Sequence, residues 1–295
     1  MLDLVRLSPR RIFPPGGEAL YRQVAILTEL SPGQEVLEVA CGKAFPLEFF
    51  VREYGAHGTG VDADAHLIEA AEARAREEDL NSVLSFQKAS PVDLPFRDDG
   101  FDVVLGDVGL AHRVDPAPAI RELVRVARPG GHVVLVQLVW KAPVPEDRKE
   151  VLAEHLGARP LMMVELRRIL KDAGVGELHT EDWTDEKTAF RPRLKKPFPD
   201  FAELFTLLEK LGILRRAWRR WGWRGVRTVF QREAEVHRLL TRERILGLSL
   251  VTGVKKELGE EAEPARGGEG EEKSEEEMQT SGLPLFGTRD ENRRS

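Results

Sequence analysis

The sequence predicts a doubly wound α/β fold with a mostly parallel sheet, and three observations lead to this prediction. Short, mainly apolar runs such as His132–Val139 (HVVLVQLV) have no regular polar face, which is typical of strands covered by helices on both sides. Segments with helical periodicity separate these runs, and Gly- and Pro-containing turns bound them. The 295 residues suffice for one α/β core with an appended element. We therefore expect strands and helices to alternate around a single sheet.

The first half of the chain supplies five of the expected strands and four helices. An amphipathic helix over Glu18–Leu30 is stopped by Ser31, Pro32 and Gly33. The expected strands are Glu35–Ala40, a second ending with Thr59–Val61, Val83–Gln87, Phe101–Leu105 and His132–Val139. The expected helices between them are Pro46–Tyr54, Ala65–Asp79 and Ala117–Ala127. Asp64 is expected to cap the second of these, and the Arg-Pro-Gly-Gly turn at 128–131 is expected to end the third.

Beyond Trp140 the alternation changes. A helix is expected over Leu161–Ala173 and a sixth strand over Glu177–Trp183. Two helices, Pro199–Leu211 and Ile213–Leu240, precede the apolar run Ile245–Val254, which is expected to return to the sheet as its last strand. The prediction is therefore a Rossmann-like domain with a helical insertion before its last strand.

These elements define three expected regions of the chain. Residues 1–186 and 243–256 form the Rossmann-like domain, 187–242 form a helical insertion that serves as a lid or substrate region, and 257–295 form a disordered acidic tail. The whole chain has a net charge of −6, but residues 191–232 carry +9 and residues 256–295 carry −6. The charge of these segments therefore says more about partners than the total does.

Composition and cysteine content suggest a cytoplasmic protein. A single cysteine excludes an internal disulfide, as expected in a reducing compartment. No apolar run approaches the roughly 20 residues that span a bilayer. The N-terminal apolar stretch is interrupted by Asp3 and Arg6, which argues against a signal peptide. The seven histidines and the cysteine show no metal-ligand spacing, so no metal is expected.

Small and acidic residues follow the first two expected strands. The first strand leads into the turn formed by Ala40, Cys41, Gly42, Lys43 and Ala44, where backbone N–H groups can approach a ligand closely. The second strand ends at Asp62, 24 residues after Glu38, and a carboxylate there can accept both ribose hydroxyls of a nucleoside. Asp62 could also serve only as a turn or cap residue. In such sheets ligands bind beyond the carboxyl ends of the strands.

Four blocks in order, LEVACG, GVDAD, DLPFRDDGFDVVL and AIRELVRVARPGGHVVLV, resemble the class I methyltransferases over about residues 13–140. The resemblance is to the type 11 group, which includes the ubiquinone and menaquinone methyltransferases, and it implies S-adenosylmethionine as the cofactor. It places the methionine part of the cofactor against Glu38 and the turn formed by Ala40, Cys41 and Gly42, and the ribose against Asp62. The adenine would lie between Ala63 and the loop of Ser90 and Pro91. The sulfonium would lie above Gly106 and Asp107.

The turn departs from the family pattern at three positions. Ala40 and Ala44 replace glycines, and Glu38 replaces an aspartate. If either alanine has a positive φ, the backbone costs roughly 1–2 kcal/mol. In the adenine loop, Ser90 and Pro91 stand where the family commonly has Asp-Ala.

The insertion contains Leu214, Trp218 and Trp221 among interleaved arginines, and three interpretations are open. The apolar residues, at i, i+4 and i+7, can pack on the sheet domain. The segment can also bind single-stranded RNA or lie on an anionic membrane. We favour packing as a lid, and disfavour a nucleic-acid partner.

The predicted function is S-adenosylmethionine-dependent methyl transfer to a small or lipid-like acceptor by in-line displacement. Candidate catalytic residues are His112, as a general base or a plain surface histidine, and Asp107. One alternative is a non-catalytic protein that keeps the fold for binding or regulation. Another is an RNA methyltransferase that uses the Arg- and Trp-rich segment.

Overall fold

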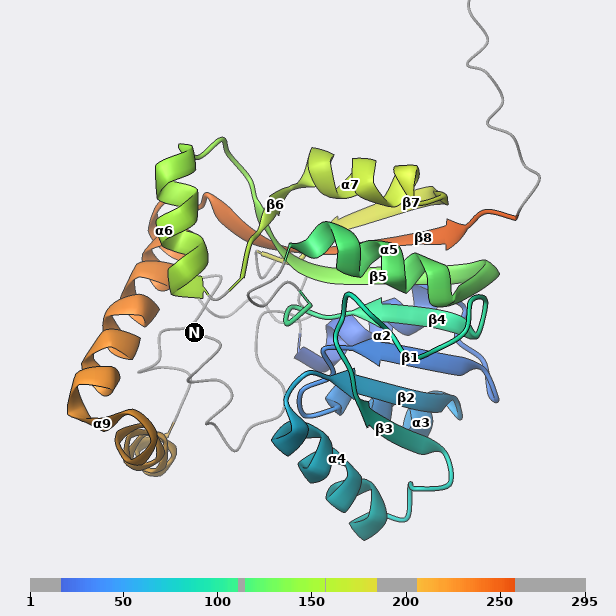
Figure 1. Cartoon of the computed structure of the whole chain (residues 1–295), viewed down its shortest axis with the longest axis horizontal. Helices are drawn as coiled ribbons and strands as arrows, with labels where there is room; N and C mark the ends of the chain where they lie inside the picture. The colour runs from blue at the N-terminus through green and yellow to red at the C-terminus, as the bar shows by residue number, and fades with distance from the viewer. Residues whose placement is uncertain (1–16, 111–114, 157, 185–205, 258–295) are drawn as a thin grey trace, which may run out of the picture. The chain divides into compact units, whose positions relative to one another are not determined.

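The computed structural model describes residues 17–110, 115–156, 158–184 and 206–257, all within the unit Met1–Leu258 (Figure 1). The helices are α2 (Gly17–Leu27), α3 (Phe45–Tyr54), α4 (Ala65–Glu77), α5 (Pro116–Val126), α6 (Glu146–Leu156), α7 (Met163–Asp172) and α9 (Leu207–His237), with a π-helical turn, η1, at Arg238–Arg242. The strands are β1 (Glu35–Val39), β2 (His57–Asp62), β3 (Leu84–Lys88), β4 (Phe101–Gly106), β5 (Ala127–Trp140), β6 (Leu161–Met162), β7 (Val175–Asp182) and β8 (Leu246–Lys255).

The strands form one sheet in the order β3-β2-β1-β4-β5-β8-β7, and β6 pairs with β5. The pairs β1–β2, β1–β4, β2–β3 and β4–β5 are parallel, whereas β8 is antiparallel to both β5 and β7. The predicted mostly parallel Rossmann-like sheet is therefore confirmed. Because Leu246 at the start of β8 pairs with Trp140 at the end of β5, segment 183–245 begins and ends at the carboxyl edge of the sheet.

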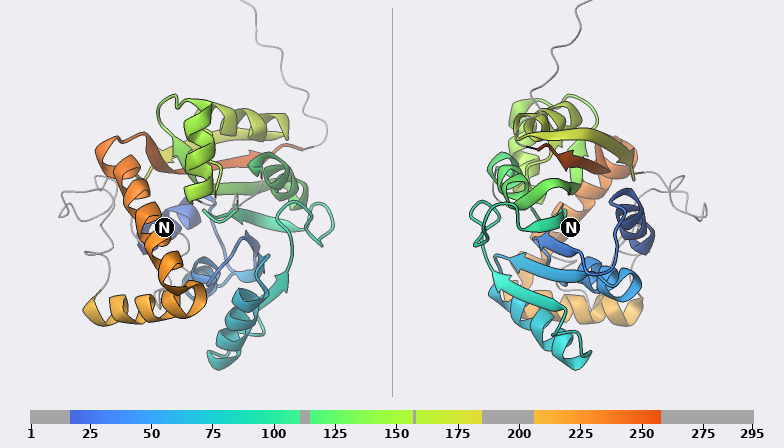
Figure 2. Two further views of the ribbon diagram at one scale, coloured as in Figure 1. Left: turned by 60° about the vertical axis from the view of Figure 1, so that its left-hand side comes forward. Right: turned by 90° about the vertical axis from the view of Figure 1, so that its right-hand side faces the viewer.

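Successive residues of the central strands face two separate helical layers. Val134 and Val136 of β5 join a core with residues of α2 and α3, while Val133 and Leu135 join a second core with residues of α5 and α7. The view along the sheet shows α2 and α5 on opposite sides of it (Figure 2). Burial on both faces explains why these strands have mainly apolar sequences.

Two predictions near the turns can be compared with the structure. Asp64 caps α4 as predicted, since its side chain accepts a hydrogen bond from the His66 amide at 3.0 Å. The prediction that the Arg-Pro-Gly-Gly segment lies outside the strand is wrong, because β5 begins at Ala127. A register shift between Phe101 and Val103 and a φ of +73° at Gly130 let the chain bulge while it stays paired.

The described part of the insertion differs from the prediction in two ways. No break separates Leu211 from Ile213, and the helix is instead kinked at Gly222, where φ is +65°. The expected packing of Trp218 is also wrong, because its side chain is 57% exposed. Ile213 and Ala217 are fully buried in its place. The buried residues are spaced by four as predicted, but they are Ile213 and Ala217 on a neighbouring face of the helix rather than the face that carries Trp218.

The part of the chain with described coordinates contains no helix long and apolar enough to cross a membrane.

Candidate active site

The turn after β1 has an unusual backbone. Ala40, Gly42 and Ala44 have φ values of +63°, +53° and +53°, so two L-residues occupy the left-handed region. Hydrogen bonds hold this turn: the Cys41 amide donates to the Val61 carbonyl at 3.0 Å, and the Ala44 amide donates to the Cys41 carbonyl at 2.7 Å. The two alanines that replace the family's glycines therefore have the backbone strain that was expected if their φ were positive.

We expect Ala40→Gly to raise the free energy of unfolding by about 0.5–1 kcal/mol. Relief of roughly 1–2 kcal/mol of left-handed strain exceeds the roughly 0.5–1 kcal/mol that a glycine costs through the unfolded chain. Urea denaturation of the two proteins measures the difference. Ala70→Gly, at an exposed position inside α4, serves as a control and should destabilise by about 1 kcal/mol. Destabilisation by both variants would show that the turn is not strained.

Glu38 lies in β1 with its side chain fully buried. Neither carboxylate oxygen accepts a hydrogen bond of standard geometry, although the nearby Leu47 amide acts to lower the pKa of this carboxyl. Burial, followed by the negative charge of Asp107, raises the pKa of this carboxyl well above its usual range. A buried carboxylate without a partner is expensive, so Glu38 is suited to a cationic ligand group that would pair with it.

Asp62, at the end of β2, bridges the first two strand ends. Its Oδ2 accepts a hydrogen bond from the Gly42 amide at 3.0 Å, and its Oδ1 accepts one from the Asp64 amide at 2.9 Å. The side chain is 7% exposed. Each carboxylate oxygen has a further lone pair, so Asp62 can hold the turn and accept hydroxyl donors together.

The residues predicted for the adenine surround the next strand end. Ala63 follows Asp62 and is exposed, and the Ala89 amide donates to the Asp62 carbonyl at 3.1 Å. Ser90 is exposed, and its hydroxyl accepts from the Val92 amide at 3.4 Å. Pro91 is partly buried. The structure thus brings Asp62 and the segment leading into Ser90 together at one edge, with the Ser90 hydroxyl turned toward its own loop.

At the end of β4, Gly106 and Asp107 have different environments. A Cβ on Gly106 would come within 2.9 Å of the side chains of Leu110, Leu123 and Leu135, so this glycine lets α5 pack closely. Asp107 accepts a hydrogen bond from the Tyr21 hydroxyl at 2.7 Å through Oδ2 and one from the Val108 amide at 2.7 Å through Oδ1. Burial raises the pKa of Asp107 and also that of Tyr21. Tyr21 therefore stays protonated and donates to the carboxylate.

Tyr21 and Gln137 belong to this region and were missed by sequence reasoning. Gln137 donates through Nε2 to the carbonyls of Gly106 and Asp107 at 3.0 and 2.8 Å. A single glutamine inside the apolar run of β5 could have indicated that Gln137 has a functional or polar contact. Tyr21 had no such signal, because only the packing of α2 brings it near Asp107.

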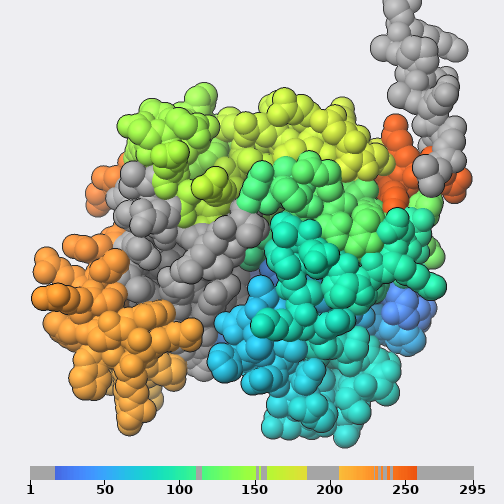
Figure 3. Space-filling view, viewed as in Figure 1, coloured from blue at the N-terminus to red at the C-terminus, as the bar shows by residue number. Residues whose placement is uncertain are grey.

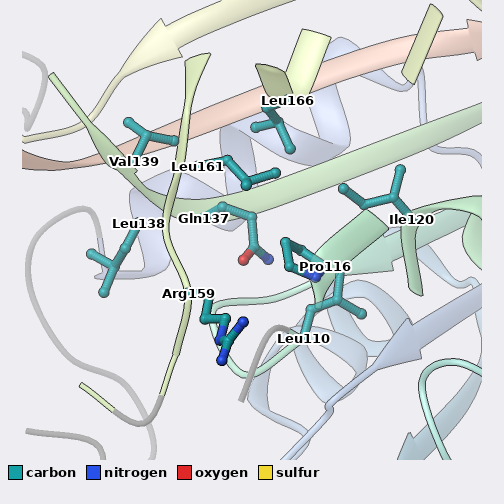
Figure 4. A pocket seen from close by; sticks show the side chains of 9 residues that line it. All are labelled: Leu110, Pro116, Ile120, Gln137, Leu138, Val139, Arg159, Leu161 and Leu166. Atoms are coloured by element: carbon teal, nitrogen blue, oxygen red, sulfur yellow. The ribbon is translucent and has the colours of Figure 1, made fainter. Parts of the chain in front are cut away.

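A small recess lies at the carboxyl end of β5 (Figure 4). Its lining is mainly apolar and consists of Leu110, Pro116, Ile120, Gln137, Leu138, Val139, Arg159, Leu161 and Leu166. Gln137 is the polar, uncharged member of this lining, and its amide donates hydrogen bonds to the carbonyls of Gly106 and Asp107. The exposed Arg159 contributes the only charged side chain among these lining residues.

Two further expectations concern catalysis and metals. His112 lies outside the described residues. Cys41 is buried, and burial raises the pKa of its thiol, which makes it a poor nucleophile. Within residues 17–110, 115–156, 158–184 and 206–257, no three His, Cys, Asp or Glu side chains are grouped as metal ligands.

The sheet order and the acidic strand ends define a class I methyltransferase fold, and comparison with known proteins agrees. A family model described as a methyltransferase domain matches residues 37–135. Residues 37–135 thus form a methyltransferase domain of the class I S-adenosylmethionine-dependent type, a class whose cofactor is S-adenosylmethionine.

Three proteins to which this chain is similar are named for different activities. Methyltransferase GfsG of Streptomyces halstedii is 28% identical over 215 residues, which are 68% of this chain and 74% of that protein. Sterol 24-C-methyltransferase erg6 of Aspergillus fumigatus is 31% identical over 167 residues, 54% of this chain and 44% of that protein. The crystal structure of the [4+2]-cyclase SpnF has a TM-score of 0.63 and 23% identity, and covers 81% of each chain.

Proposed function

We propose that this protein transfers the methyl group of S-adenosylmethionine to a small or lipid-like acceptor. The observation that carries the proposal is the buried, unpaired carboxylate of Glu38, which lies within electrostatic range of Asp62 and Asp107. S-adenosylmethionine carries an ammonium and a sulfonium, and three carboxylates at one edge of the sheet complement both charges.

The proposed contacts follow the order of the strand ends. Glu38 pairs with the ammonium, and the backbone of the turn surrounds the methionine part. Asp62 accepts the ribose hydroxyls with its free lone pairs. The full set of cofactor contacts comprises Glu38, Ala40, Cys41, Gly42, Asp62, Ala63, Ser90, Pro91, Gly106 and Asp107.

When bound, S-adenosylmethionine supplies a methyl carbon that the acceptor attacks while the carbon–sulfur bond breaks and sulfur keeps the electron pair. The protein's own residues align the two reactants and exclude water, which supplies much of the acceleration for an activated leaving group. Both oxygens of Asp107 already accept hydrogen bonds. We therefore assign Asp107 to positioning and charge stabilisation, and each of its oxygens, like those of Asp62, keeps a lone pair for one further donor.

The small recess at the end of β5 is the proposed contact point for one apolar group of the acceptor. It shares Gln137 with the backbone of Gly106 and Asp107, so it adjoins the proposed sulfonium position. Its leucine-rich lining suits an apolar molecule, and the similarity to a sterol methyltransferase supports the same class. Arg159 forms no ion pair with a described residue and would bind a carboxylate or phosphate on such an acceptor.

We expect Arg159→Met to raise KM about tenfold or more for acceptors that carry a carboxylate or phosphate, because a charged hydrogen bond is lost. Neutral acceptors should be unaffected, and affinity for S-adenosylhomocysteine should not change. Release of S-adenosylhomocysteine from a panel of fatty, prenyl and sterol-like molecules measures the rates. Arg167→Met, at an exposed position of α7, is the matched control. Equal losses on neutral and anionic acceptors would contradict the role of Arg159.

Calorimetry with S-adenosylmethionine and S-adenosylhomocysteine tests the function itself. We expect both to bind with one site per chain. Absence of binding at millimolar ligand would refute the proposal and favour the second candidate, a protein that keeps this fold for another purpose.

Strain at Ala40 and Ala44 is the observation in favour of that second candidate. The similarity to the [4+2]-cyclase shows that the fold is found with another reaction.

A further inference from the structure

Large hydrophobic side chains are exposed mainly on α9. Eight such side chains are exposed in the described part of the chain, and five of these belong to α9. These five are Leu207, Leu208, Leu211, Trp218 and Trp223, with exposed fractions between 57% and 83%. The other three lie singly on other elements, as is usual for a soluble domain. The concentration on one helix therefore needs an explanation.

The exposed residues form a stripe along the first part of α9. Leu207, Leu211, Leu214 and Trp218 are spaced by four, three and four residues, so they share one face of the helix. Leu214 is partly buried and the other three are exposed. Ile213 and Ala217, which lie on a different face, are fully buried and attach the helix to the protein. The stripe is therefore additional to the packing face and remains available for a partner.

Exposed basic side chains lie on the same helix as this stripe. Besides Arg216, the exposed arginines of the same helix are Arg215, Arg219, Arg220, Arg224 and Arg227. Between 207 and 231 the sequence contains a single acidic residue, Glu209. The exposed arginines of this helix other than Arg216 form no ion pair with a described residue, whereas the chain as a whole is acidic, with a net charge of −6. The segment therefore favours an anionic partner and would direct this side of the protein toward it.

We propose that the surface formed by residues 207–227 of α9 binds anionic lipid membranes. Leucine and tryptophan side chains enter the interface between headgroups and acyl chains, and arginines beside them contact the lipid phosphates. Single-stranded RNA fits less well, because bases stack on aromatic rings and three of the five exposed side chains are leucines. Figure 3 shows α9, in orange, exposed along one side of the molecule.

The kink at Gly222 divides the proposed surface between two helical segments. Its φ of +65° and ψ of −177° change the direction of the helix between Trp218 and Trp223. Both tryptophans remain exposed on the two sides of the kink. Tryptophan is enriched at membrane interfaces because its ring is apolar and its N–H can donate to the headgroup region. Two such rings would hold both parts of the helix at the same depth.

Flotation of the full-length protein with phosphatidylcholine vesicles, with and without phosphatidylglycerol, tests the proposal. We expect binding to the anionic vesicles at about 0.15 M salt, at least tenfold weaker binding to the neutral ones, and weakening at high salt. The Leu211→Ser, Trp218→Ser double variant should bind at least tenfold more weakly. The Arg215→Gln, Arg219→Gln double variant should lose about 25-fold, or roughly fivefold for each arginine.

Matched controls separate this surface from a general effect of apolarity or charge. Val164→Ser removes a side chain of α7 that is 77% exposed, and Arg167→Gln with Arg168→Gln removes two exposed arginines of the same helix. Both controls should bind vesicles like the parent. All variants replace exposed side chains, so melting temperature and S-adenosylhomocysteine binding should be unchanged and will confirm that each protein is folded.

Three results would overturn the proposal. The first is absence of binding to anionic vesicles. The second is an equal loss of binding in the α7 controls. The third is micromolar or tighter binding of single-stranded RNA at about 0.15 M salt that depends on Arg215 and Arg219 and displaces the vesicles. None of these depends on the methyl-transfer proposal, because no step of the experiment requires the cofactor.

Discussion

Replacement of Glu38 by glutamine should weaken binding of S-adenosylmethionine and S-adenosylhomocysteine by about 30-fold or more. The carboxylate is fully buried and accepts no hydrogen bond of standard geometry, so the proposed ammonium contact is a desolvated charge pair. Losing one member of such a pair costs about 2–5 kcal/mol. Calorimetry at neutral pH measures the change. Glu35→Gln, at the exposed start of the same strand, should leave affinity unchanged.

The same variant should alter the pH dependence of binding. Burial and the charge of Asp107 raise the pKa of Glu38, so the carboxyl is protonated and neutral below that raised pKa. A neutral carboxyl cannot pair with an ammonium, and affinity should therefore increase as pH rises through the folded-state pKa. Glu38→Gln should lack this increase. An unchanged pH profile in the variant would show that another group controls binding.

Stability should change in the opposite direction to affinity. A carboxyl whose pKa is raised by folding binds more protons in the folded protein than in the unfolded chain, so it lowers stability as pH rises above its unfolded pKa. Glu38→Gln removes this penalty. We expect the ligand-free variant to gain on the order of 1 kcal/mol above neutral pH, and less under acidic conditions. A loss of stability at every pH would indicate that Glu38 has a structural partner.

Asp62→Ala should weaken cofactor binding at least tenfold and also destabilise the protein. Removal of the carboxylate leaves the amides of Gly42 and Asp64 without their acceptors. Each unpaired amide costs about 1–3 kcal/mol when buried. The melting temperature should therefore fall while the protein remains folded, and the ribose hydroxyls lose their proposed acceptor.

The neighbouring carboxylate separates these two effects. Asp64→Ala removes the N-cap of α4 and should cost about 1 kcal/mol of stability without any change in cofactor affinity. Asp62→Asn, which retains one acceptor oxygen, should fall between the parent and the alanine variant in both measurements. Affinity that stays constant in Asp62→Ala would remove Asp62 from the cofactor site and leave it a purely structural role.

The sequence alone determined the sheet and the edge of it at which we propose that the cofactor binds. Apolar runs such as β4 and β5 are buried on both faces, and this requirement is local enough to be visible in composition. The sequence also predicted that the turn after β1 and the carboxylate of Asp62 lie at the same edge of the sheet. Parallel strands have their carboxyl ends at one edge, whatever the positions of the helices between them. The sequence also predicted backbone strain at Ala40 if its φ were positive, and the structure gives a φ of +63° there.

Only the tertiary structure decided which partners each side chain has. Tyr21 is 86 residues from Asp107 in the chain, and no periodicity predicts their hydrogen bond at 2.7 Å. The face of α9 that is buried could not be predicted either, since Ile213 and Trp218 belong to overlapping apolar patterns and only contact with the rest of the protein distinguishes them. Local sequence specifies that an element is amphipathic, whereas the orientation of its apolar residues depends on surfaces contributed by distant segments.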